Sequence, residues 1–149
     1  MRSLLTCLAA AFAALPAIAA DATSLSITAA WSPAAADVRT DVPLYMTITN
    51  QATEADELLR IRCPVALFSE KRTTDYGEGA PAAREIKTIP VAAGETLVLA
   101  PGKYHVMLLE TTQPLMEGQT FSCTVAFRKA GNQQVEVKVA TADAQSAPP

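Results

Sequence analysis

The sequence predicts an all-β domain, an antiparallel sandwich of strands with Greek-key connections. Apolar and polar residues alternate in several short segments, which is the pattern of half-buried strands. Turn-forming residues separate these segments at near-regular intervals, as at Gly94, Gly102, Gly118 and Gly131. Helical periodicity is nearly absent, so no segment supplies the crossover helices of an α/β fold. A closed barrel is the alternative arrangement.

The first twenty residues have the pattern of a signal peptide rather than of the domain. Arg2 supplies a positive charge at the start. An almost unbroken apolar run covers residues 4–15 and is too short to anchor a chain stably in a bilayer, and Pro16 ends it. The protein is therefore expected to be exported, to the periplasm.

Small residues mark the expected cleavage point. Ala17 and Ala19 fit the preference of signal peptidases, so the signal peptide is expected to cover residues 1–20 and the mature chain to begin at Ala20 or Asp21. The tetrapeptide ending at Cys7 weakly resembles a lipid-attachment box. This alternative is the weaker one, because no hydrophobic segment precedes Cys7.

Composition restricts the possible partners. The chain has 149 residues, 18% of them charged, and a formal net charge of −3, which loss of Arg2 with the signal would make one unit more negative. Nucleic-acid binders carry basic patches, and anionic membrane surfaces attract basic segments, so neither partner is expected. After processing about 130 residues remain, enough for one domain with a sizeable core.

Seven segments are expected to form strands. The last shows the alternation most clearly, with Val135, Val137 and Val139 separated by charged residues. In another, Leu59 and Ile61 are expected to share one face with Cys63, and the intervening arginines to occupy the other. The expected strands are residues 25–28, 44–49, 58–63, 96–99, 104–109, 121–127 and 135–139.

Three segments do not follow this alternation. Residues 32–43 are rich in alanine and proline and are expected to form a long loop. Residues 71–84 are polar and contain glycine, and we expect them to be irregular. Residues 142–149 are small, polar and end in proline, and we expect a disordered tail. The folded domain is then expected to cover residues 21–141.

Two cysteines, Cys63 and Cys123, remain after signal cleavage. An exported protein folds in an oxidising compartment, where such a pair usually forms a disulfide. Two buried free thiols are the alternative.

One pair of residues suggests metal chemistry. His105 and Met107 are two apart in an expected strand, so both side chains point to the same side. An imidazole together with a thioether suits Cu(I) better than zinc, calcium or magnesium. The competing interpretation is that His105 is an ordinary core or edge residue.

The remaining polar clusters give no catalytic site. The chain has a single histidine, which excludes an HExxH zinc site, and it contains no phosphate-binding glycine loop, nucleophile elbow or CxxC motif. The protein is therefore not expected to be an enzyme. A basic cluster of Arg60, Arg62, Lys71 and Arg72 either contacts an acidic partner or is the solvent side of a strand.

Several short blocks resemble one known family. They are PGKYHVML at 101–108, QPLMEG at 113–118, YMTITN at 45–50 and PVAAGET at 90–96. Together they resemble the periplasmic PCu(A)C-type copper chaperones, over about residues 27–139. The resemblance implies a cupredoxin-like sandwich that carries one Cu(I) and delivers it to the dicopper centre of cytochrome c oxidase. We expect a monomer.

This chain departs from the family at the copper ligands. The resemblance implies four ligands, a His, a Met and a His-x-Met, and His105 and Met107 match the last two. Counting back along the sequence places Ala83 where the other Met is expected and Arg72 where the other His is expected. Met116 is a possible additional ligand, whereas Met46 alternates within an expected strand and is assigned to the core.

Two functions therefore remain after sequence analysis. The first is a periplasmic Cu(I) chaperone with a reduced His-x-Met site, binding copper more weakly than a relative with four ligands. The second is a binding or scaffolding module that keeps the chaperone fold without useful copper affinity.

Overall fold

The computed structural model describes residues 24–149, so the expected signal peptide lies outside the described residues. Those residues contain no α-helix, which confirms the all-β class, and accordingly no helix long and apolar enough to cross a membrane. The strands are β1 (Leu25–Pro33), β2 (Val42–Asn50), β3 (Asp56–Arg62), β4 (Ala66–Asp75), β5 (Ala82–Ile86), β6 (Ile89–Val91), β7 (Thr96–Leu99), β8 (His105–Thr111), β9 (Thr120–Phe127) and β10 (Gly131–Ala140).

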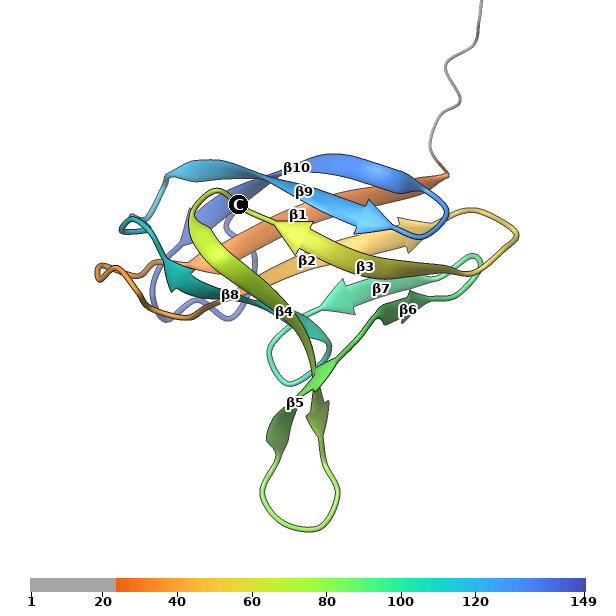
Figure 1. Ribbon diagram of the computed structural model, residues 1–149, viewed down its shortest axis with the longest axis horizontal. Coiled ribbons are helices and arrows are strands. Elements are labelled where there is room, and N and C mark those ends of the chain that lie inside the picture. Colours follow the sequence, from red (N-terminus) through yellow and green to blue (C-terminus); the bar gives the residue numbers. More distant parts are fainter. Residues whose placement is uncertain (1–23) are drawn as a thin grey trace, which may run out of the picture.

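The strands form one hydrogen-bonded path that folds into a sandwich (Figure 1). Its order is β5-β4-β8-β2-β1-β10-β9-β3-β6, and β7 pairs with β2 outside this path. The first half of β2 pairs with β8 and its second half pairs with β7. The sequence predicted antiparallel pairing throughout, but β1 and β10 are parallel. These two strands lie at opposite ends of the chain, so no hairpin fixes their relative direction.

The core is built from alternate residues of the strands. In β8, Val106 and Leu108 are fully buried in it. Because side chains alternate along a strand, His105 and Met107 point to the other face. The largest fully buried side chains are Leu44, Met46, Ile48, Leu58, Ile89, Leu99, Leu108, Leu115, Val91, Val106, Val125 and Val137.

A β-bulge changes the burial expected for β3. The pairing of β3 with β9 shifts register between Leu58 and Arg60. Leu58 is therefore fully buried while Leu59 is only half-buried, and Ile61 and Cys63 remain buried as expected. The alternation read from the sequence was wrong at Leu59, because an extra residue in one strand reverses the faces on one side of it.

The segment 71–84, expected to be irregular, largely forms a hairpin. Residues 71–75 of β4 pair with residues 82–86 of β5, and the hairpin projects from the body at the bottom of Figure 1. Its side chains are exposed or half-buried on both faces. A strand with little core contact needs no apolar face, so its sequence lacks the alternation that predicts a strand.

The tail also has a defined course, whereas its composition predicts disorder. Ala144 and Ala147 pack on a small cluster formed by Trp31, Tyr45 and Ala140. The Lys138 ammonium donates a hydrogen bond to the carbonyl oxygen of Pro149, 3.1 Å away. Small alanines can lie flat on aromatic rings, which gives this polar segment an apolar contact that composition does not reveal.

Candidate metal centre

A tight turn at residues 100–104 sets the start of β8. The Lys103 N–H donates to the Ala100 carbonyl at 3.1 Å. Gly102 has a φ of 75°, and a Cβ there would lie 2.9 Å from the hydroxyl of Tyr76. The Tyr76 hydroxyl donates to the Gly102 carbonyl at 2.5 Å. Glycine is therefore required by the backbone and by this close approach, which ties the β4–β5 hairpin to the turn before His105.

The imidazole of His105 is held with one nitrogen available. Nδ1 lies 2.9 Å from the Lys103 carbonyl oxygen, so an Nδ1–H tautomer donates there and leaves the lone pair on Nε2. His105 is 9% exposed. Every buried side-chain nitrogen and oxygen in the described part of the chain has a hydrogen-bond partner. Nε2 has none there, so it is not one of the buried atoms. Nε2 must therefore reach solvent, as a metal-binding nitrogen requires.

Met107 lies on the same outward face of β8 and is half-buried. It faces Pro43 of β2 on one side and Glu70 of β4 on the other. The structure thus brings together the imidazole and thioether that the sequence singled out, on one strand and one face.

Aromatic rings form one wall beside His105. The ring centres of Tyr45 and His105 are 6.4 Å apart, and those of Tyr45 and Trp31 are 4.8 Å apart. Burial raises the pKa of the Tyr45 hydroxyl above its ordinary value, so the phenol stays neutral. The sequence analysis did not single out these two rings. Strict alternation along β1 would place Trp31 in the core with Leu25, but a register shift between Thr28 and Trp31 turns it to the outer face beside Tyr45.

Arg72 occupies the position directly across from His105. The two residues are partners in the β4–β8 pairing, and Glu70 is the partner of Met107. The Arg72 guanidinium donates to one Glu70 oxygen from two nitrogens, at 2.7 and 3.1 Å. Glu70 therefore offsets part of the positive charge that Arg72 places beside His105, a contact that the sequence analysis did not anticipate.

Ala83 shares this outward face but lies on the next strand. It pairs with Thr74, which is two residues beyond Arg72, and it is exposed. Alanine offers no donor atom, and an arginine that keeps its proton is not a metal ligand. The two positions at which family resemblance expects further ligands are thus close to the site but supply none.

Met46 and Met116, the other methionines in the described residues, lie away from this face. Met46 is 1% exposed and pairs with Leu99, which agrees with its assignment to the core. Met116 is 52% exposed, in the turn after the far end of β8, where its N–H donates to the Gln119 side chain at 3.2 Å. The far end of β8, Thr111, is six residues beyond His105, a length of about 20 Å along the strand.

The cysteines form a disulfide between β9 and the residue that follows β3. The sulfur atoms of Cys63 and Cys123 are 2.02 Å apart and the Cα atoms 4.4 Å apart. Both residues are buried. In this state neither sulfur is a thiolate, so neither is available as a copper ligand.

The donor set favours a low coordination number. The described residues contain no group of three or more His, Cys, Asp or Glu side chains able to hold a metal. His105 and Met107 supply one nitrogen and one sulfur, which suits a near-linear Cu(I) and leaves a tetrahedral zinc site unfilled. The fold is that of a PCuAC copper chaperone-like domain.

Comparison with known proteins agrees with this class. A family model described as "Putative lipoprotein LpqE-like" matches residues 25–139. The chain belongs to this LpqE-like family, and membership in a lipoprotein-type family agrees with an exported protein. None of the curated proteins matches the chain in sequence.

Solved structures share the fold over most of the chain. The apo PCuAC domain of PmoF2 is 22% identical, with a TM-score of 0.70, covering 83% of this chain and 95% of that one. The copper-bound PCuAC domain from PmoF2 is 21% identical, with a TM-score of 0.69, covering 79% and 93%. The Cu(I) form of DR1885 from Deinococcus radiodurans is 27% identical, with a TM-score of 0.63, covering 82% and 83%.

Proposed function

We propose that this protein is a periplasmic chaperone, not an enzyme, that carries one Cu(I) on His105 and Met107. The observation that carries the proposal is the pairing of an accessible Nε2 with a thioether on one outward face of β8. The fold shared with Cu(I)-bound DR1885 supports it. The proposed acceptor is a protein such as the cytochrome c oxidase subunit that holds the dicopper centre.

Hand-over would use ligand exchange. Cu(I) held by two donors has open coordination positions, so a donor of the acceptor can bind before His105 or Met107 leaves. No electron moves in this step, because copper stays Cu(I) throughout. The Tyr45 ring lies on the β2 side of the imidazole and Arg72 lies on the β4 side, so the acceptor would approach from the outward face of the sheet.

A second function is favoured by the Arg72–Glu70 pair. This ion pair lies across from both donors, and its guanidinium opposes a cation at His105. A scaffolding module with the chaperone fold and no useful copper affinity is therefore the alternative.

A Cu(I) titration with a competing chromophoric chelator separates the two functions. Wild type should bind at most one Cu(I). Loss of a residue that only hydrogen-bonds to a metal ligand lowers metal affinity roughly 10–100-fold. His105→Ala removes a ligand itself, so it should weaken Cu(I) binding by more than that. Met46→Leu is the matched control, because it removes a buried sulfur at nearly constant volume and should leave binding unchanged. Absence of binding by wild type would favour the scaffolding function.

Export predicts the mass of the mature protein. Protein recovered from its native host should begin at Ala20 or Asp21, because cleavage follows Ala19 or Ala20. Intact mass spectrometry with N-terminal sequencing measures this. A chain that begins at a lipid-modified Cys7 would contradict the prediction and support the lipid-attachment alternative.

A further inference from the structure

β3 and β4 follow one another along the chain but separate in space. They diverge from the turn at residues 63–65 (Figure 1). Along residues 59–62, β3 has only β9 as a partner, because β6 reaches only the first part of β3. Along residues 66–70, β4 has only β8, because β5 pairs further on. Within the described chain, these two strand edges are therefore open. One hydrogen bond connects them, from the Ser69 hydroxyl to the Ile61 carbonyl at 2.6 Å.

A groove of about 790 Å³ lies along these two edges. β3 contributes Arg60 and Arg62 to its lining, and β4 contributes Leu67 and Phe68. Leu67 is 58% exposed and Phe68 is 62% exposed, so two adjacent large apolar side chains face solvent. Open main-chain edges beside apolar side chains are the features that strand-adding peptides recognise.

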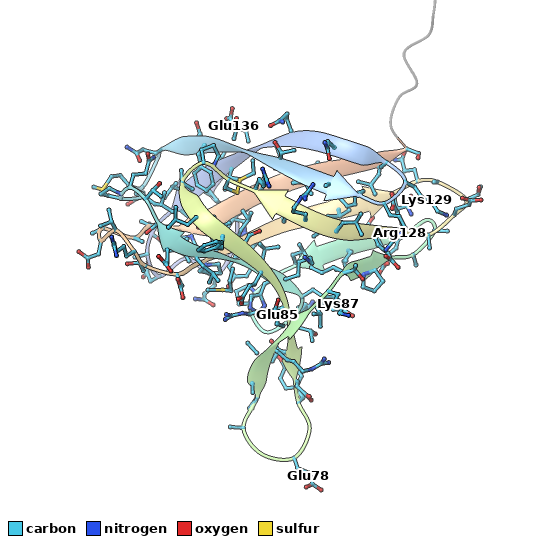
Figure 2. All side chains as sticks on the ribbon, in the orientation of Figure 1. Glu78, Glu85, Lys87, Arg128, Lys129 and Glu136 are labelled. Atoms are coloured by element: carbon cyan, nitrogen blue, oxygen red, sulfur yellow. A yellow bond between two sulfur atoms is a disulfide. The ribbon has the colours of Figure 1, made fainter. Side chains whose placement is uncertain are left out.

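The groove carries positive charge on an acidic protein. Neither Arg60 nor Arg62 lies within 4 Å of a carboxylate in residues 24–149. Burial lowers the pKa of the nearby Lys71; the charge of Glu85 opposes this shift, and the charge of Arg60 adds a smaller lowering. Glu136 pairs across from Ser122 on the outer face of β10 (Figure 2) and is not ion-paired with either arginine. Arg60 and Arg62 both line the groove, so a carboxylate placed between these two like charges would lower their repulsion.

We propose that this groove binds an extended, acidic segment of a partner protein. The segment adds as a strand to the open edge of β3 or β4, with its carboxylates at Arg60 and Arg62 and an apolar side chain against Phe68. The groove lies outside the copper ligands, and its binding requires no metal. The inference therefore stands independently of the proposed copper function.

A labelled seven-residue peptide tests the proposal, with glutamate alternating with valine and leucine. Fluorescence anisotropy with the purified mature protein should show saturable binding. Amide chemical-shift changes should concentrate at residues 59–62 and 66–70. The double variant Arg60→Glu/Arg62→Glu should weaken binding at least about tenfold, because two exposed charge pairs become repulsive. Lys87→Glu is the matched control, since Lys87 is exposed and outside the groove lining (Figure 2).

Several outcomes would overturn the proposal. One is no saturable binding, or equal binding by wild type and the double variant when both show the same thermal unfolding. Another is equal binding of a peptide with lysine in place of glutamate, which would remove the role of charge. Self-association of wild type that Phe68→Asp abolishes would assign the groove to a second copy of the chain.

Discussion

Arg72→His should tighten Cu(I) binding at least about tenfold, or ~1.4 kcal/mol, and Ala83→Met should tighten it further. Arg72 is the direct partner of His105 in the antiparallel β4–β8 pair. Side chains at such positions have Cβ atoms about 5 Å apart, so two imidazoles can share one ion. The change also removes a positive charge and leaves Glu70 beside the cation, and both effects favour binding.

The two substitutions should not contribute equally. Ala83 lies on β5, two strand spacings or about 10 Å from β8, and it is offset along the strand by its pairing with Thr74. A methionine at position 83 can reach the ion only if the β4–β5 hairpin bends toward His105. The Tyr76–Gly102 hydrogen bond, which ties the hairpin to the turn before His105, supports such a bend. We therefore expect most of the gain from Arg72→His.

Arg72→Ala separates the effect of charge from that of the added donor. It removes the guanidinium and supplies no ligand, so it should tighten binding less than Arg72→His. Competition with a chelator measures the Cu(I) affinity of wild type and of the four variants. These are Arg72→Ala, Arg72→His, Ala83→Met and Arg72→His/Ala83→Met. If wild type binds as tightly as Arg72→His/Ala83→Met, other ligands take part and the reduced-site account is wrong.

The fold could be predicted because core contact and alternation go together. Val135, Val137 and Val139 are all buried, and β10 contains the strand predicted there. The strands that were missed, β4, β5 and β6, are the ones with polar hairpin residues or only three residues in length. Without an apolar face or a sufficient length, a strand leaves little periodic signal.

The site was predictable only within one strand. His105 and Met107 share a face because they are two residues apart, which holds for any strand. Their neighbours depend on register between strands that are far apart in sequence. The placement of Glu70 across from Met107 and of Tyr45 beside His105 follows from that register. No local pattern in the sequence specifies it.

Removing the disulfide should substantially lower the free energy of unfolding. Cys63 and Cys123 are 60 residues apart, and a bridge closing a loop of that length stabilises a fold by about 4 kcal/mol through restriction of the unfolded chain. The double variant Cys63→Ala/Cys123→Ala should lose about this free energy of unfolding, measured by urea denaturation. Wild type treated with a non-thiol reductant is the control and should lose a similar amount. A loss below about 0.5 kcal/mol would contradict the prediction.

The same variant tests whether the bridge keeps the copper site selective. Reduced cysteines are stronger Cu(I) donors than a thioether, so the oxidised pair leaves His105 and Met107 as the available soft site. The alanine double variant, where it remains folded, should bind Cu(I) as oxidised wild type does. Reduced wild type should bind Cu(I) more tightly, through the freed thiols. If the folded double variant loses copper binding, Cys63 and Cys123 are ligands and the assignment to His105 and Met107 is wrong.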